Sequence, residues 1–166
     1  MVVGHSLSGR AALLAAQGDT SIEGLVLVAP AGLIRLRVGP ALLATTIHWL
    51  VRRDEPSSAR LLRRMTGPGA DLPAELAHWT SLVGRHVRTS LAPSPLPPAA
   101  LGEVRWRVWL VAGRHDPFLP AQRLTDALTR FGGPTAAVVV DTAGHLVPEE
   151  APHEVVRAVE GAGERL

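Results

Sequence analysis

The sequence contains no cysteine, no lysine and no tyrosine. The absence of cysteine excludes a disulfide framework, a thiol nucleophile and a zinc site built from thiolates. All 17 basic residues are arginine, which together with 16 glycines and 14 prolines indicates the coding bias of a GC-rich bacterial genome. Because little titrates between histidine and arginine, the isoelectric point of 10.8 overstates a net charge of only +2. No basic stripe interleaved with aromatic residues is present, so we expect no nucleic-acid partner.

Long apolar runs are also missing. The longest nearly apolar stretch, residues 38–51, is shorter than the roughly 20 residues that a transmembrane helix needs, so we expect no transmembrane segment. Arginines flank this stretch, so an interfacial helix is one interpretation. We favour a lid helix whose apolar face covers a pocket. The first residues lack the charged start of a signal peptide, so we expect a cytoplasmic protein, although a longer N-terminal part would be able to carry a signal.

Residues 2–9 read Val-Val-Gly-His-Ser-Leu-Ser-Gly and precede a helix-forming run. This pattern is typical of a nucleophile elbow, a sharp strand-to-helix turn that lifts Ser6 above the end of a sheet. Gly4 and Ser8 occupy the positions where only small side chains avoid a clash, and Ser8 departs from the strict G-x-S-x-G motif. A helix that begins at Leu7 would offer the Leu7 N–H to an oxyanion. The alternative is a Gly/Ser turn without chemistry.

Two further predicted strands end in polar loops. Asp116 follows an apolar run at residues 108–112, and His145 follows a second run at residues 136–141. Polar residues therefore follow three strands, where α/β sheets place their sites. A serine hydroxyl needs a base at neutral pH, and the base needs an acid that holds its tautomer. Ser6, His145 and Asp116 are candidates for these roles.

Each candidate has an alternative interpretation. For Asp116, which precedes a proline, the alternative is an ordinary turn residue. Asp141 is a rival acid, although its place at a strand end favours a role in capping the turn. His145 would be a loop histidine with satisfied hydrogen bonds. For the other histidines near these motifs, we expect packing or pocket roles at His5 and His115 and a surface position at His153.

In this order along the chain, the three motifs resemble the lid-bearing branch of the α/β-hydrolase superfamily. The matching segments are Gly-His-Ser-Leu-Ser-Gly at 4–9, Gly-Arg-His-Asp-Pro-Phe-Leu-Pro at 113–120 and Ala-Gly-His-Leu-Val-Pro-Glu-Glu-Ala-Pro at 143–152. The resemblance implies that Ser6 is the nucleophile, His145 the base and Asp116 the acid, with the Leu7 N–H as an oxyanion donor. It implies no cofactor and no metal.

The resemblance further implies a serine hydrolase that cleaves an ester, thioester or amide-type bond through an acyl-enzyme. The expected partner is a small-molecule substrate with an apolar acyl or alkyl part, and the oligomeric state stays open. An acyltransferase and a cofactor-free haloperoxidase-like enzyme are alternatives with the same motifs. A dehalogenase or epoxide hydrolase is disfavoured, because those relatives place an aspartate where Ser6 stands.

The predicted architecture is α/β, a partial α/β-hydrolase fold with a parallel sheet, flanking helices and a helical lid. Residues 1–32 and 104–166 would form the core, and residues 33–103 the lid. Strands are expected at residues 2–4, 25–29, 108–112 and 136–141, and helices at 7–17, 39–53, 56–66, 72–90, 120–131 and 152–163. Candidates to line a pocket from the lid are Leu42, Trp49, Leu50, Trp79, Leu82 and Val83, unless they form the core of the lid itself.

The elbow occurs unusually early in the chain. The related fold has more strands before the elbow than after it, so several β/α units of very roughly 20–30 residues each would precede Met1. The expected consequences are an open sheet edge at the first strand and a missing second oxyanion donor. The alternative to an enzyme is therefore a truncated, non-catalytic fragment or a hydrolase-like binding module.

Overall fold

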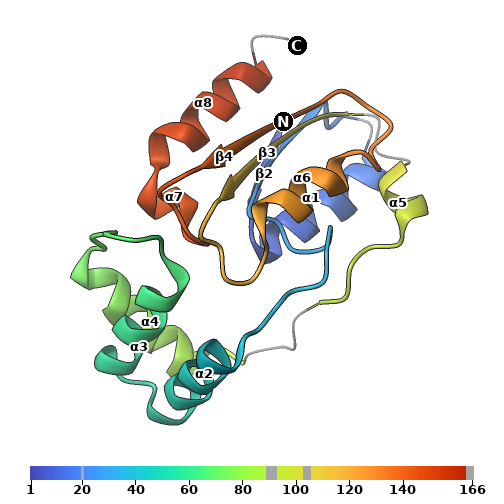
Figure 1. Ribbon diagram of the computed structural model, residues 1–166. Coiled ribbons are helices and arrows are strands. Elements are labelled where there is room, and N and C mark those ends of the chain that lie inside the picture. The colour runs from blue at the N-terminus through green and yellow to red at the C-terminus, as the bar shows by residue number, and fades with distance from the viewer. Residues whose placement is uncertain (20, 89–92, 103–105, 164–166) are drawn as a thin grey trace.

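The computed structural model describes residues 1–19, 21–88, 93–102 and 106–163. Strands alternate with helices on both sides of a helical segment (Figure 1). In chain order the elements are β1 (Val2–His5), α1 (Leu7–Gly18), β2 (Gly24–Val28), α2 (Pro40–Arg52), α3 (Glu55–Met65), α4 (Ala74–His86), α5 (Pro98–Gly102), β3 (Arg107–Gly113), α6 (Ala121–Leu128), β4 (Thr135–Val140), α7 (Val147–Glu150) and α8 (Pro152–Gly163). Apart from the one-turn helices α5 and α7, the order is β-α-β, helical insertion, β-α-β-α, as the sequence predicts.

Within the described residues, the strands form one four-stranded parallel sheet in the order β1-β2-β3-β4. The register pairs Gly4 with Leu27 and Leu27 in turn with Leu110. Because all four strands run the same way, their carboxyl ends meet at one edge of the sheet. The loops that follow β1, β3 and β4 therefore emerge close to one another.

Alternation along the strands divides the core between the two faces of the sheet. Leu25 and Leu27 of β2 pack with α1 and α6 on one face, whereas Val26 and Val28 pack with α8 on the other. Figure 1 shows α1 and α6 on one side of the sheet and α8 on the other. Both faces of β2 are covered, which explains why this strand reads as a continuous apolar run. The sheet thus holds its loops on a rigid, two-sided core.

The helices α2, α3 and α4 form the lid, which lies beyond the carboxyl ends of the strands (Figure 1). Its own small core contains Leu42, Trp49 and Leu61, and the Trp49 indole N–H donates to Ser58 Oγ at 3.0 Å. Asp54 caps α3 by accepting the Ser57 N–H. No helix in the described part of the chain is long and apolar enough to cross a bilayer.

The outer face of α2 is less covered than its inner face. Leu43, Ile47 and Val51 recur every fourth residue and are all exposed. The stretch at residues 38–51 thus buries one side of its helix in the lid core and leaves an apolar stripe on the other side.

The predicted element boundaries agree with the structure to within a few residues, with three differences. The helix expected at 72–90 ends at His86 and Val87 is extended, while residues 89 and 90 lie outside the described residues. The one-turn helices α5 and α7 are not predicted, because a single turn leaves no periodicity in the sequence. The expected core boundary at residues 103 and 104 also lies outside the described residues, and Leu101 just before it packs in the core of the sheet.

Candidate active site

Ser6 occupies a left-handed, strained backbone conformation between β1 and α1, with φ 52° and ψ −117°. The turn is held by its own backbone, since the Ser6 N–H donates to the Val28 carbonyl at 3.0 Å and the Ser6 carbonyl accepts from Ala31 N–H at 2.9 Å. Ser6 is the N-cap residue of α1, yet its hydroxyl makes no capping bond in the described structure. The hydroxyl is therefore available to other partners, and the Leu7 N–H beside it belongs to the first turn of α1, where N–H groups lack intrahelical acceptors.

Close packing explains the small residues of this turn. A Cβ added to Gly4 would lie 2.6 Å from the Ser8 carbonyl oxygen and 2.8 Å from the Gly9 Cα. A Cβ on Gly9 would lie 2.6 Å from the Pro30 Cβ. The side chain of Ser8 is exposed, so the departure from the G-x-S-x-G motif costs no space at that position.

The structure brings Ser6, His145 and Asp116 together from three separate loops. His145 Nδ1 lies 2.7 Å from Asp116 Oδ2, and His145 Nε2 lies 3.0 Å from Ser6 Oγ. Because a carboxylate only accepts, Nδ1 carries the proton and Nε2 accepts from the serine hydroxyl. The three side chains thus form one hydrogen-bonded relay, with the tautomer that a general base requires.

Asp116 is held in a single orientation by its own loop. Its Oδ1 accepts the N–H of Phe118 at 2.8 Å and the N–H of Leu119 at 2.9 Å, while its Oδ2 is left for His145. The Asp116 side chain is fully buried and that of His145 is 6% exposed. A low-dielectric setting strengthens the interaction between the two groups relative to water. Asp116 therefore stabilises its turn through the two backbone N–H groups, and the same carboxylate also contacts His145.

His145 is surrounded on its other sides by three groups that sequence reasoning did not assign to it. The Phe118 ring meets the imidazole edge to face, with centroids 4.9 Å apart. His5 Nε2 donates to the His145 carbonyl oxygen at 2.9 Å, and the two rings are tilted at a centroid distance of 5.2 Å. Burial lowers the pKa of His5, although its bond to the His145 carbonyl opposes that shift. The His145 N–H donates to the Met65 carbonyl of the lid at 2.6 Å.

Glu150 lies in the segment 143–152 that carries the family resemblance, although no role was predicted for it. Its carboxylate accepts the N–H of Gly67 at 2.6 Å and the N–H of Gly144 at 2.9 and 3.1 Å to the two oxygens. Gly67 lies in the loop between α3 and α4, and Gly144 directly precedes His145. These contacts join backbone groups far apart in the sequence, so no local pattern announces them.

The other candidate residues lie away from the relay. Asp141 is exposed and its Oδ1 accepts from Arg114 Nε at 2.6 Å, so it ties the ends of β3 and β4 together instead of capping a turn. His115 is exposed near the lid loop. His153 is a surface residue, as expected, at 66% side-chain exposure.

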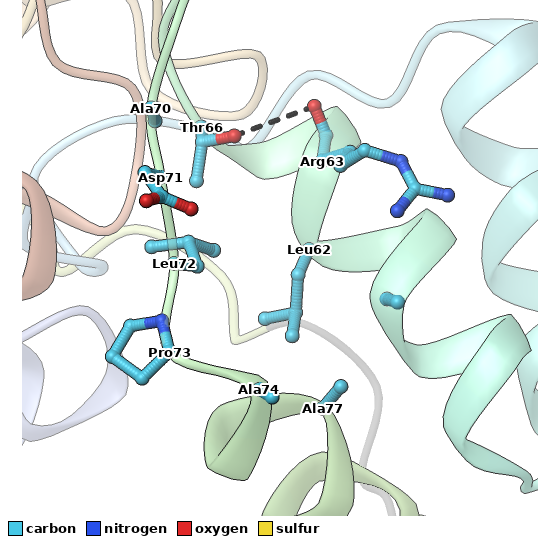
Figure 2. A pocket seen from close by; sticks show the side chains of 10 residues that line it. Leu62, Arg63, Thr66, Ala70, Asp71, Leu72, Pro73, Ala74 and Ala77 are labelled. Carbon is cyan, nitrogen blue, oxygen red and sulfur yellow. Dashed lines mark hydrogen bonds between the residues drawn. The ribbon is translucent and has the colours of Figure 1, made fainter.

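The lid contains a pocket of about 200 Å³ between α3 and α4, and Figure 2 shows its lining. The lining is mostly small and apolar, with Arg63, Thr66 and Asp71 as its polar members. None of the six lid residues expected to line a pocket lies among them, although Leu50 lines a separate hollow together with Arg53 and residues 84–88. Of those six, Leu42 and Trp49 are buried in the core of the lid, while Trp79 is 62% exposed.

The comparisons with known proteins concern the family and the fold of the chain. The family model described as "Alpha/beta hydrolase family" matches residues 1–158. No curated protein matches the chain. The fold is similar to that of carboxylesterase CesB from Bacillus subtilis (TM-score 0.72, 20% identity, covering 96% of this chain and 57% of that one). It is similar also to naproxen esterase from Bacillus subtilis (TM-score 0.75, 17% identity, 96% and 57%).

A third similar structure is the 2-hydroxy-6-oxo-6-phenylhexa-2,4-dienoate hydrolase of Rhodococcus sp. strain RHA1 (TM-score 0.74, 17% identity, 98% of this chain and 63% of that one). The chain therefore spans about three fifths of the length of these structures, at 57–63%. Identities this low show a shared fold, whereas the family match covers nearly the whole chain. On that match, the chain belongs to the alpha/beta hydrolase family.

Proposed function

We propose that this chain carries the catalytic residues of a serine hydrolase that cleaves an ester, thioester or amide-type bond through an acyl-enzyme. The single observation that carries the proposal is the relay of Ser6, His145 and Asp116, with distances of 3.0 and 2.7 Å. A relay of this kind converts a weakly nucleophilic hydroxyl into a nucleophile at neutral pH. Membership in the alpha/beta hydrolase family supports the same reaction class.

Acylation begins at the Ser6 hydroxyl. Its oxygen attacks the substrate carbonyl carbon while His145 Nε2 accepts the hydroxyl proton. Asp116 stabilises the positive imidazolium that results, and its two backbone bonds hold it in place for this task. The Leu7 N–H stabilises the negative oxygen of the tetrahedral intermediate. The intermediate collapses when His145 returns the proton to the leaving group, which departs as an alcohol, thiol or amine.

Deacylation repeats these steps with water. His145 takes a proton from water, the resulting hydroxide attacks the acyl carbon, and the second tetrahedral intermediate releases a carboxylic acid. The proton on His145 returns to Ser6 Oγ, which restores the enzyme. Each step uses the relay, the Leu7 N–H and water, so the proposal requires no metal or organic cofactor.

The proposed substrate is a small molecule with an apolar acyl or alkyl part. Two apolar residues neighbour the relay: the ring of Phe118 meets that of His145, and Leu7, the residue after Ser6, is 56% exposed. Apolar surface next to a polar reacting centre is typical of pockets for such substrates.

The proposal is tested on the purified 166-residue chain. We expect a fluorophosphonate probe to label one site, and p-nitrophenyl acetate, butyrate and octanoate to be hydrolysed. Ser6→Ala abolishes labelling and turnover, because it removes the attacking oxygen. Ser8→Ala is the matched control, since Ser8 is an exposed serine two residues away, and it labels like the wild-type chain.

Two outcomes contradict the proposal. Labelling that persists in Ser6→Ala assigns the reactive group to another residue. The second outcome is a chain that unfolds cooperatively, and so is folded, but that neither reacts with the probe nor hydrolyses esters. This result favours the alternative of a non-catalytic hydrolase fragment or binding module. That alternative draws on one observation, the coverage of only 57–63% of the similar structures.

A further inference from the structure

The backbone of the lid is in direct contact with the backbone of the loop that contains His145. The His145 N–H donates to the Met65 carbonyl at the end of α3. A Cβ added to Gly67 would overlap the Thr142 carbonyl oxygen, and one added to Gly144 would overlap the Met65 carbonyl oxygen. Neither glycine leaves room for a side chain, so the α3–α4 loop and the loop before His145 touch without any intervening side chain.

Glu150 clamps this contact from the side. One of its oxygens accepts the N–H groups of both Gly67 and Gly144, and the other accepts from Gly144. The N–H of a residue in the lid and the N–H of the residue before His145 thus share one carboxylate. Hydrogen bonds to a carboxylate are about twice as strong as bonds between neutral groups. Glu150 is the last residue of α7, the one-turn helix that begins two residues after His145.

We propose that Glu150 is a positioning residue that binds the α3–α4 loop to the His145 loop and so keeps His145 Nε2 in reach of Ser6. The inference rests on the proposed function. In this role Glu150 couples the position of the lid to that of His145, since the same carboxylate orients Gly144 and anchors Gly67. A misplacement of about 1 Å in a catalytic group lowers the reaction rate by about 100-fold. A small shift of the His145 loop is therefore sufficient to lower the rate strongly.

The same contact reaches the lid pocket. Thr66 is one of its lining residues (Figure 2). It lies between Met65, which accepts the His145 N–H, and Gly67, whose N–H donates to Glu150. A displacement of this loop therefore alters the wall of the pocket and the support of His145 together.

The test compares Glu150→Ala and Glu150→Gln with Glu149→Ala. Glu149 is the matched control, because it is the neighbouring glutamate and is exposed. The readouts are the rate of fluorophosphonate labelling of Ser6 and the separate kcat and KM for p-nitrophenyl butyrate. We expect Glu150→Ala to lower the labelling rate and kcat by about 10- to 100-fold, with KM changed less than about threefold. Glu150→Gln keeps one accepting oxygen and lies between Ala and wild type, while Glu149→Ala stays within about twofold of wild type.

All rates are measured well below the melting temperature of each variant, so that a loss of stability alone leaves them unchanged. If Glu150→Ala does not fold, Glu150→Gln carries the test. Folded variants that label at the wild-type rate overturn the inference. A wild-type chain that does not label at Ser6 overturns the proposed function instead.

Amide hydrogen exchange tests the clamp independently of activity. In Glu150→Ala we expect the amides of Gly67 and Gly144 to exchange faster together, because both lose the same acceptor. Exchange of either amide at the wild-type rate contradicts the clamp, whether or not the chain is active.

Discussion

Replacing Asp116 with asparagine changes the relay at a single atom. Asparagine keeps an oxygen for the N–H groups of Phe118 and Leu119, so the loop retains both of its bonds. The oxygen that faces His145 Nδ1 at 2.7 Å becomes an NH₂ group. Because that group donates, Nδ1 must accept, and the proton of the neutral imidazole moves to Nε2.

The consequence falls on Ser6. With the proton on Nε2, His145 donates to Ser6 Oγ across the 3.0 Å contact and no longer accepts its proton. A substitution that imposes this tautomer in a serine relay lowers kcat by about 10⁴-fold. At 1.36 kcal/mol for each tenfold change, the lost stabilisation of the transition state is about 5.5 kcal/mol. The fold itself is expected to persist, with a melting temperature close to that of the wild type.

The assay measures kcat/KM for p-nitrophenyl butyrate and the fluorophosphonate labelling rate, alongside thermal unfolding by circular dichroism. Asp141→Asn is the control, since Asp141 is the rival acid and forms an exposed ion pair with Arg114. We expect it to change the rate less than about twofold. The reasoning is refuted if Asp116→Asn keeps more than about a tenth of the activity, or if Asp141→Asn is the variant that loses it.

Two further predictions concern stability. Gly4→Ala places a Cβ 2.8 Å from Gly9 Cα, so we expect a melting temperature lower by about 2 to 12 °C, whereas Gly18→Ala, with open space around it, changes little; equal effects would contradict the elbow packing. Hydrogen bonds from Ser57 lower the pKa of Asp54 from 3.8 to about 2, so its carboxylate stabilises the fold above pH 4 and this contribution is lost as the pH falls through about 2. Asp54→Ala should therefore lower the melting temperature by about 2–4 °C at pH 7, and by progressively less between pH 4 and pH 2; a difference that does not vary with pH would contradict the assignment.

Local patterns predict most of the fold. The last helix is expected at residues 152–163 and found at Pro152–Gly163, because its apolar positions repeat with the helical period. The strands are equally visible, since β2 is buried on both faces and reads as an unbroken apolar run. The short helices α5 and α7 escape prediction because one turn contains too few residues for a period.

The sequence likewise predicts one part of the candidate active site and not the other. Ser6, Asp116 and His145 are visible in the sequence because each is a polar residue just after a strand, in segments that resemble those of a known family. The contacts of Glu150 and Met65 are invisible to such patterns. They join backbone atoms of the lid to backbone atoms of a loop roughly 80 residues away, and a backbone N–H or carbonyl has no sequence signature.

The order of the elements, the turn at Ser6 and the identity of the three polar residues at the strand ends follow from the amino-acid sequence, since these depend on local propensity and side-chain type. Only the tertiary structure decided that Asp116 and not Asp141 contacts His145, because that choice depends on how each loop leaves its strand. It also decided that the Met65 carbonyl of the lid accepts the His145 N–H, because parallel pairing brings distant carboxyl ends to one edge, where the insertion between β2 and β3 also emerges.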